Sequence, residues 1–368
     1  MTFHPFEIAF CGYSGSGKTT LLTKVVRSLA ERYSVACYKH GCHHFSLDKE
    51  GKDSWLMRQA GASAVMIGDP QQQALMAERG VFSLALERHA FAFADMLLVE
   101  GLKELPLPKL LMIDAERRIV KLWQQGSISN VLGFISPDDP QHYTDYGLPV
   151  MQRDNVEAIA HFVESILLER AKAHYPLNGL LLAGGQSSRM GSDKALLSYH
   201  GDNQLQHTAA LLREVCCNVY VSCRQEQAEH YCQFGIPLIT DAYLGIGPMG
   251  GLLSAQQAHP NAAWLVTACD MPLLTPKTLQ QLAEERQPLR FATAFRHPQT
   301  QRLEPLFAIY EPKTRIPLLL QHAEGNNSLA SFLATARIAA LMPDAAQSLL
   351  NINTPDEQKS FEQNQGRA

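Results

Sequence analysis

Three features that would each define a different class of protein are missing from this sequence. None of its eight cysteines forms a Cys-x-x-Cys pair, and several stand in apolar runs, which indicates buried thiols in a reducing compartment rather than a disulfide scaffold. No apolar run approaches the length needed to span a bilayer. The first seven residues show no basic region followed by an apolar stretch, so no secretory signal is expected. These absences predict a cytoplasmic protein with no membrane partner.

A large excess of either charge is missing as well. The chain carries 32 basic and 36 acidic residues, a net charge of −4, so no overall field attracts nucleic acid or an anionic membrane. Any phosphate binding must therefore come from local loops. With 368 residues, of which 46% are hydrophobic, the chain is long enough for about two globular domains with cores of normal size.

A glycine-rich loop follows the first expected strand, residues 6–11, and precedes apolar residues at helical spacing from Leu21 to Leu29. The loop contains the complete G-x-x-x-x-G-K-[ST] pattern, made of Gly12, Tyr13, Ser14, Gly15, Ser16, Gly17, Lys18 and Thr19. In this setting the loop amides and the helix N-terminus cradle phosphates, Lys18 reaches the terminal phosphates, and the Thr19 hydroxyl joins a Mg²⁺ shell. The pattern predicts a nucleoside triphosphate site.

Two further segments bear on that site. The apolar strand expected at 96–100 ends in Glu100, which would hold or orient the metal; an ordinary strand-end carboxylate is the alternative. Another expected strand, ending at Tyr38, is followed by His40, Cys42, His43 and His44. Their spacing matches no tetrahedral zinc pattern. A loop lining the nucleotide cleft, a metal site and an ordinary polar loop therefore all remain open for the segment 40–44.

A second glycine-rich loop opens the other half of the chain. A helical pattern over 154–173 stops near Pro176, and a new apolar strand runs from Leu177 to Ala183, which predicts domains at 1–172 and 173–368. The loop that follows contains Gly184, Gly185, Arg189 and Lys194. Glycines allow close backbone approach to a ligand, successive amides bind anions, and the two basic side chains suit phosphate oxygens. A surface turn with two basic residues is the alternative.

The second half then alternates strands and helices, which indicates a mostly parallel sheet covered on both faces. Ligands bind at the carboxyl ends of the strands in such sheets. One expected strand ends in Asp241, shortly before the glycine-rich stretch 245–251, and another ends at Asp270. Asp270 follows an unbroken apolar strand and is the residue expected to bind Mg²⁺ together with substrate phosphates.

Particular residues in the second half resemble the molybdenum cofactor guanylyltransferases, the MobA family. They are Leu182-Ala183-Gly184-Gly185, Ser188-Arg189-Met190-Gly191 and Asp193-Lys194-Ala195-Leu196. The resemblance implies a Rossmann-like nucleotidyltransferase that binds GTP through Leu182, Ala183, Gly184, Gly185, Lys194, Asp241 and Asp270. It also implies Mg²⁺ on Asp270, catalysis by Asp270, Lys194 and Arg189, and contact of Asn351 or Asn353 with the pterin substrate. Ser222-Cys223 stands where many relatives have Asn.

The first half, over about residues 5–170, resembles the molybdopterin-guanine dinucleotide biosynthesis adapter, MobB. The resemblance rests on the phosphate loop, Lys39-His40 with His43, Asp48 with Gly51-Lys52-Asp53-Ser54, Ala60-Gly61-Ala62, and Leu98-Val99-Glu100-Gly101. It implies a P-loop NTPase-like domain that binds GTP and hydrolyses it weakly. No Asn-Lys-x-Asp motif occurs in the chain, so guanine preference here is implied by the resemblance only.

Three functions are compatible with these observations. The first is a fused adapter and transferase that joins GMP from Mg·GTP to molybdopterin or Mo-molybdopterin, with acceptor molybdoenzymes as further partners. The second is a nucleotidyltransferase that uses CTP or a sugar phosphate. The third is a GTP-dependent carrier that hands cofactor to acceptor enzymes and has little transferase activity. The presence of Gly184, where relatives that use CTP tend to have alanine, favours GTP.

Overall fold

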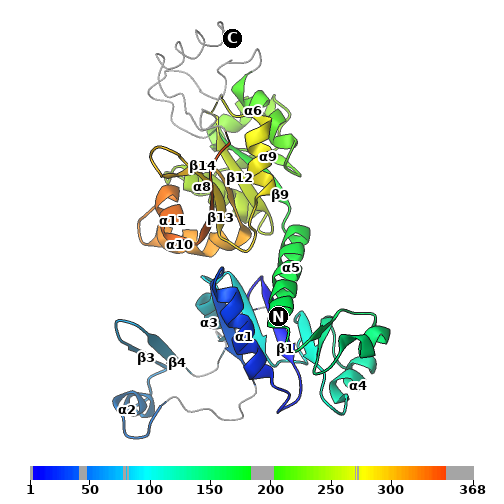
Figure 1. Cartoon of the computed structure of the whole chain (residues 1–368). Helices are drawn as coiled ribbons and strands as arrows, with labels where there is room; N and C mark the ends of the chain where they lie inside the picture. The colour runs from blue at the N-terminus through cyan, green and yellow to red at the C-terminus, as the bar shows by residue number, and fades with distance from the viewer. Residues whose placement is uncertain are drawn as a thin grey trace. The chain divides into compact units, whose positions relative to one another are not determined.

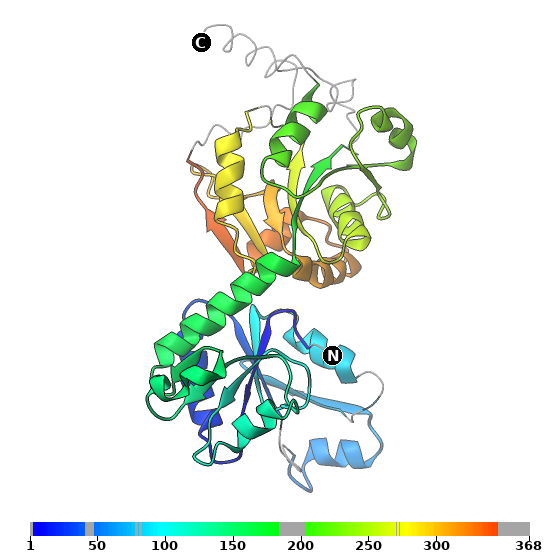
Figure 2. The ribbon, with the colours of Figure 1, turned by 90° about the vertical axis from the view of Figure 1, so that its right-hand side faces the viewer.

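A computed structural model of the chain describes residues 3–40, 48–77, 80, 83–183, 203–269, 271 and 273–344. The chain divides into two compact units, Met1–Val163 and Glu164–Ala368 (Figures 1 and 2). The division falls inside one helix, α5 (Val156–His174). Within the described ranges no helix is both long and apolar enough to cross a lipid bilayer.

The first unit is built on a six-stranded parallel sheet with strand order β2-β5-β1-β6-β7-β8. Its elements are β1 (Glu7–Cys11), α1 (Lys18–Ala30), β2 (Val35–Lys39), α2 (Asp53–Gln59), β3 (Ala64–Gly68), β4 (Gln73–Ala77), α3 (Ser83–Phe91), β5 (Met96–Glu100), β6 (Lys109–Met112), α4 (Arg118–Gln124), β7 (Val131–Ser136), the 3₁₀ helix η1 (Pro140–Tyr146) and β8 (Val150–Gln152). All residues of β1, β5 and β6 are buried and most of them are apolar, as is typical of strands in the middle of a parallel sheet. The strands β3 and β4 form a separate hairpin that lies with α2 away from the main sheet (Figures 1 and 2).

The second unit contains a seven-stranded sheet with strand order β11-β10-β9-β12-β14-β13-β15. Its elements are β9 (Leu177–Leu182), α6 (Gln204–Arg213), β10 (Val219–Cys223), α7 (Gln225–Cys232), β11 (Leu238–Thr240), α8 (Pro248–Ala258), β12 (Ala263–Ala268), α9 (Pro276–Glu284), β13 (Ala292–Arg296), β14 (Leu303–Tyr310), η3 (Pro312–Thr314), α10 (Arg315–Ala323), α11 (Leu329–Thr335) and β15 (Ile338–Leu341). Every strand pair is parallel except the two that involve β14. The expected mostly parallel α/β architecture is therefore confirmed.

Two apolar layers cover the second sheet, one on each face. Leu181 of β9 packs in the layer that includes α6 and α9, whereas its neighbour Leu180 packs in the layer that includes α8, α10 and α11. Adjacent residues of a strand point to opposite faces, so an unbroken apolar run supplies both layers. Figure 1 shows α6 and α9 on one side of the strands and α10 and α11 on the other. This packing holds the carboxyl ends of β9, β10, β11 and β12 along one edge.

Candidate functional site

The first candidate site is the loop between β1 and α1. Gly15 and Gly17 adopt φ angles of 78° and 83°, a left-handed conformation that residues with a Cβ rarely take up. The loop borders a cavity of about 740 Å³, which is lined by Cys11, Gly12, Ser14, Gly15, Gly17, Lys18, Thr19, Thr20, Lys39, His40, Glu100, Gly101, Leu102, Lys103 and Glu104. The hydroxyl of Ser16 is buried without a hydrogen-bond partner in the described structure. A buried orphan hydroxyl inside such a loop suits a bound phosphate.

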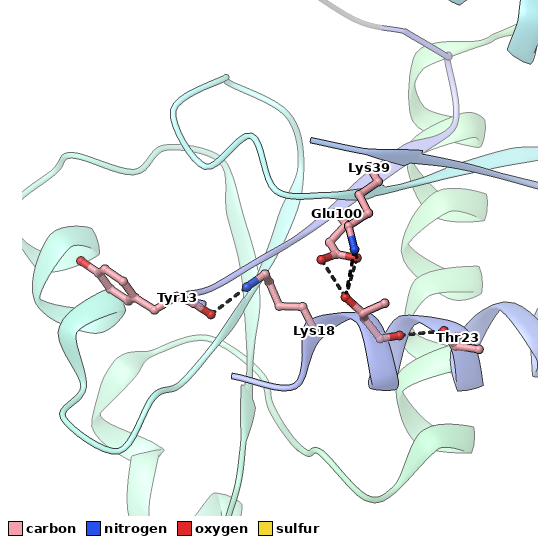
Figure 3. A network of polar contacts seen from close by, with 6 residues as sticks. Tyr13, Lys18, Thr23, Lys39 and Glu100 are labelled. Carbon is pink, nitrogen blue, oxygen red and sulfur yellow. Dashed lines mark hydrogen bonds and ion pairs between the residues drawn. The ribbon is translucent and has the colours of Figure 1, made fainter. Parts of the chain in front are cut away.

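Thr19 and Glu100 meet at the wall of this cavity, as expected for a metal-dependent phosphate site. The Thr19 hydroxyl donates to Glu100 across distances of 2.9 Å to Oε1 and 3.0 Å to Oε2. Lys39, at the end of β2, places its Nζ 3.7 Å from Glu100 Oε2 and 3.5 Å from Thr19 Oγ1 (Figure 3). Hydroxyl and carboxylate oxygens are the ligands that Mg²⁺ prefers, so this pair fits such an ion together with substrate phosphates. Sequence patterns alone assign no role to the Lys39 side chain.

The side chain of Lys18, the first residue of α1, reaches back to the preceding loop. Its Nζ donates to the carbonyl oxygen of Tyr13 at 2.7 Å (Figure 3). Burial lowers the pKa of Lys18 from its ordinary value, and the negative charge of Glu100 opposes that shift. A partly desolvated ammonium group beside loop amides is well placed to exchange its carbonyl partner for phosphate oxygens.

The histidine cluster is described only in part. His40 lines the cavity and donates its backbone N–H to the carbonyl of Glu100 at 2.9 Å, in agreement with a loop that borders the cleft. Cys42, His43 and His44 lie outside the described residues. Among the residues that are described, no group of three or more His, Cys, Asp or Glu side chains is arranged to hold a metal ion.

The second candidate site lies at the carboxyl ends of four parallel strands. In chain order these strands are β9, β10, β11 and β12, and their order in space places β9 and β12 side by side, where the direction of winding reverses. Open α/β sheets bind ligands at this point. Ala268 of β12 pairs in register with Leu182 of β9, and the Cys269 thiol donates to the Leu182 carbonyl at 3.5 Å. The two strand ends that precede Gly184 and Asp270 are therefore held together.

Asp241 follows β11 and reaches the end of β10. Its carboxylate accepts a hydrogen bond from the Ser222 hydroxyl at 2.6 Å, and its backbone N–H donates to the Cys223 carbonyl at 2.9 Å. Burial raises the pKa of Asp241, while the hydrogen bond from Ser222 and the charge of Arg224 act in the opposite direction. Ser222, which the sequence marked as a departure from the family, thus orients the predicted nucleotide-binding aspartate.

Two glycines of α8 allow this helix to approach the strand ends closely. A Cβ added at Gly251 would lie 2.5 Å from Ser222 Oγ and 2.7 Å from Leu182 Cδ2. One added at Gly250 would lie 2.2 Å from the carbonyl oxygen of Tyr243. The N-terminus of α8, an 11-residue helix, therefore lies beside the ends of β9 and β10, and its positive pole suits an anionic ligand. The predicted loop 245–251 ends earlier than expected, because α8 already begins at Pro248.

Several predicted residues lie outside the part of the chain that the structure describes. They are Gly184, Gly185, Arg189, Lys194, Asp270, Asn351 and Asn353. Leu182, Ala183 and Asp241 are described. The Asp241 side chain accepts a hydrogen bond from Ser222, and the Leu182 side chain lies beside Gly251, which is also next to Ser222. The backbone of Ala183 donates to the carbonyl of Ser222 at 2.9 Å, so these three residues share one edge.

Replacing Asp241 by asparagine should reveal how much its buried charge costs the stability of the folded chain. Its raised pKa means that the charged form is less favourable in the folded than in the unfolded chain. This penalty is complete above the folded-state pKa and absent below the unfolded-state pKa. We expect Asp241→Asn to be at least as stable as the wild type at pH 7, with the difference shrinking as the pH falls to about 4.

Urea unfolding of both proteins over this pH range measures the effect, and Glu229→Gln, at an exposed position of α7, serves as the control. A stability difference that grows on acidification would contradict the assignment.

Comparison with known families defines the class of each half of the chain. Residues 179–341 match the model described as MobA-like NTP transferase domain. Residues 7–136 match the model described as MobB: Molybdopterin guanine dinucleotide synthesis protein B. The chain is thus a nucleotidyltransferase domain preceded by a P-loop domain, and the predicted fusion is confirmed.

Individual relatives carry the assignment to a family. A probable molybdenum cofactor guanylyltransferase of Chloroflexus aggregans is 31% identical over 196 residues, which are 50% of this chain and 93% of that protein. A molybdenum cofactor biosynthesis bifunctional protein of Synechocystis is 33% identical over 183 residues, 50% of this chain and 52% of that protein. The molybdopterin-guanine dinucleotide biosynthesis adapter protein of Haemophilus influenzae is 43% identical over 110 residues, 28% of this chain and 61% of that protein. The chain belongs to the molybdenum cofactor guanylyltransferase family.

Proposed function

We propose that domain 173–368 transfers GMP from Mg·GTP to molybdopterin or Mo-molybdopterin and releases pyrophosphate. Membership of the guanylyltransferase family is the observation that carries this proposal. The edge formed by Leu182, Ala183, Ser222 and Asp241 supports it, because it has the position and chemistry of a nucleotide site in an open α/β sheet. The matched segment covers 52% of the bifunctional relative, so the activity of the whole chain is part of the proposal.

The proposed reaction needs no nucleophile from the protein. An oxygen of the terminal phosphate of the acceptor forms a bond to the α-phosphorus of GTP, and the bond between that phosphorus and the bridging oxygen to the β-phosphate breaks. The electron pair leaves with pyrophosphate. Arg189 and Lys194 neutralise the departing charge, and the amides of Gly184 and Gly185 bind phosphate oxygens. Catalysis then consists of positioning and charge stabilisation.

Magnesium enters the proposal as part of the substrate, Mg·GTP. Asp270 is the carboxylate that we assign to it in this domain, and Asn351 and Asn353 are assigned to the pterin. Asp241, oriented by Ser222, provides a second carboxylate at the same edge and is assigned to the nucleotide. Oxygen ligands from one or two carboxylates are what Mg²⁺ requires when phosphates complete its shell.

Domain 1–172 is proposed to bind GTP and to assist the synthesis or delivery of the cofactor to acceptor molybdoenzymes. The loop Gly12–Thr19, the Thr19–Glu100 pair and the cavity of about 740 Å³ support this role. Thr19 and Glu100 would hold a Mg²⁺ ion, whose charge would favour binding of the phosphates. We assign the chain to the cytoplasm, as the spacing of its cysteines predicts.

Lys18→Ala should separate the two domains functionally. Because Lys18 is the phosphate-reaching cation of the first loop, the variant should lose GTP binding by that domain. GMP transfer by the purified full chain should fall by no more than a few fold, and delivery of cofactor in cells should fall much further. A complete loss of transfer in the purified system would contradict this division of labour and favour the GTP-dependent carrier.

The decisive assay of the proposed function uses the purified full chain with Mg·GTP and molybdopterin. Mass spectrometry should detect molybdopterin guanine dinucleotide, and pyrophosphate should appear in equal amount. Parallel reactions with ATP, CTP and UTP, and with sugar phosphates as acceptors, test the alternative substrates. Faster release with CTP, or no dinucleotide with GTP, would overturn the proposal.

A further inference from the structure

A fully buried lysine is bonded to a loop of the first candidate site. Lys109, the first residue of β6, has no exposed surface, although lysine is almost never completely buried unless its charge has partners. Its Nζ donates to the backbone carbonyls of Lys103 at 3.3 Å, of Ser129 at 3.0 Å and of Leu105. An ammonium group has three N–H donors, so each of them has an acceptor. These bonds offset the cost of taking the charge out of water.

The loop that Lys109 contacts is a short crossover between two strands. Residues 101–108 lead from β5 to β6, which lie on opposite sides of β1 in the sheet. A connection between parallel strands in one sheet usually takes a dozen or more residues and contains a helix. This crossover has eight residues, all of them described, and none is helical. Its backbone polar groups must therefore find partners outside a helix.

The partners of the crossover differ between its ends and its middle. Both ends are bonded to β1, Gly101 through its N–H and Pro108 through its carbonyl. In the middle, the carbonyls of Lys103 and Leu105 accept from the Lys109 ammonium group. The middle of the crossover is therefore tied to the sheet by a side chain, whereas its ends are tied by the backbone.

The first half of the crossover is also a wall of the cavity at the first loop. Gly101, Leu102, Lys103 and Glu104, here called the crossover wall, line that cavity of about 740 Å³ together with residues of the phosphate loop. The Lys103 Nζ lies 5.1 Å from the centre of the Tyr13 ring, which belongs to the phosphate loop. A displacement of the crossover wall would therefore change the width of the cavity and its contact with the phosphate loop.

The backbone of the crossover wall adopts a conformation that needs support from its surroundings. Leu102 has a φ of 56°, a left-handed conformation that costs about 1–2 kcal/mol in a residue with a side chain. Gly101 has a φ of 101°, and a Cβ added to it would lie 2.9 Å from the carbonyl oxygen of His40. Such conformations persist only where the surrounding structure fixes them. The bond from Lys109 to the carbonyl of Lys103, the residue after Leu102, provides this support.

We propose that Lys109 is a positioning residue for nucleotide binding in the first domain. Its buried ammonium group holds the crossover wall against the phosphate loop. Because all three of its hydrogen bonds are made to protein carbonyls, the wall is in place before a nucleotide arrives. Binding then does not have to order this segment, which avoids an entropic cost. The inference rests on the proposed binding of GTP by domain 1–172.

Hydrogen exchange of the full chain, measured by peptide mass spectrometry, tests this role. Peptides that cover 101–105 report on the crossover wall. Peptides that cover 12–19 report GTP binding at the first cavity separately from binding by the second domain. In the wild type without nucleotide, we expect the amides of 101–105 to be protected from exchange.

Lys109→Met keeps the length of the side chain but removes its donors. In this variant 101–105 should lose most of its protection. If the wall is then in place for about a tenth of the time, half-protection of 12–19 should need about tenfold more Mg·GTP. By linkage, saturating Mg·GTP should restore protection of 101–105 in the variant.

Asn130→Gly is the matched control at the same crossover. It removes a 3.0 Å hydrogen bond to the Pro106 carbonyl, outside the wall, and its φ of 56° suits glycine. Exchange of 101–105 and the GTP requirement should both stay within about twofold of the wild type. Equal effects of Asn130→Gly and Lys109→Met would contradict a specific role of Lys109.

Two other results would overturn the proposal. Unprotected amides at 101–105 in the nucleotide-free wild type would show that the wall is not held in advance, and this result does not depend on how the variant folds. An unchanged GTP requirement in a folded Lys109→Met would limit Lys109 to a structural role. If Mg·GTP fails to protect 12–19 in the wild type, the proposed GTP binding fails instead, and exchange of 101–105 in the variant still decides whether Lys109 holds the wall.

Discussion

Asp270→Asn is expected to lower the rate of the proposed GMP transfer by about 10²–10³-fold while the protein stays folded. Asp270 follows the buried strand β12, whose end is paired in register with the end of β9 and bonded to it through Cys269. The end of β12 belongs to the same edge of the sheet as the end of β11, which precedes Asp241. Asparagine has nearly the same shape as aspartate but carries no charge. The substitution should therefore lower kcat and leave the stability of the protein nearly unchanged.

Steady-state pyrophosphate release with GTP and molybdopterin measures this effect, and circular dichroism checks the fold. Glu229→Gln, an exposed carboxylate of the same unit, is the matched control and should retain full activity. If Asp270→Asn keeps more than about a tenth of the wild-type kcat, Asp270 does not hold the metal, because removing a charge-stabilising group costs more than that.

Gly250→Ala is expected to destabilise the second unit by about 1–3 kcal/mol and to weaken nucleotide binding. The added methyl group would lie 2.2 Å from the carbonyl oxygen of Tyr243, and this backbone atom cannot rotate away as a side chain could. The first turn of α8 must therefore shift. Because the neighbouring Gly251 contacts Ser222, which orients Asp241, the shift should reach the nucleotide site.

Differential scanning calorimetry of the full chain measures the loss, since the two units can unfold in separate transitions. Gly68→Ala serves as the control: a Cβ there would meet only ordinary contacts, the nearest at 3.8 Å, so its effect should stay within about 0.5 kcal/mol. An unchanged transition of the second unit in Gly250→Ala would show that α8 can move without cost, and would contradict the inference that its close approach to the strand ends matters for stability.

Local sequence was sufficient for the elements that a single segment specifies. The strand–loop–helix unit around Gly12–Thr19 forms as predicted, because an apolar run, two glycines at left-handed positions and a helical apolar pattern lie next to one another in the chain. The strands ending at Glu100 and at Ala268 were likewise evident as apolar runs. Each of these signals arises from residues close in sequence.

Such local patterns do not predict contacts between segments that are distant in the sequence. Lys39 and Glu100 are separated by many residues, and they meet only because β2 pairs with β5 in register. Ser222 reaches Asp241 through the parallel pairing of β10 and β11.

By itself the sequence determined that this protein has two α/β domains and identified the family through residues clustered in two glycine-rich loops, for which it predicts phosphate binding. Only the tertiary structure decided which side chains from separate strands face one another: Lys39 with Glu100, and Ser222 with Asp241. The physical reason is that loop chemistry depends on neighbours in the chain, whereas strand register and strand order depend on packing across the whole core.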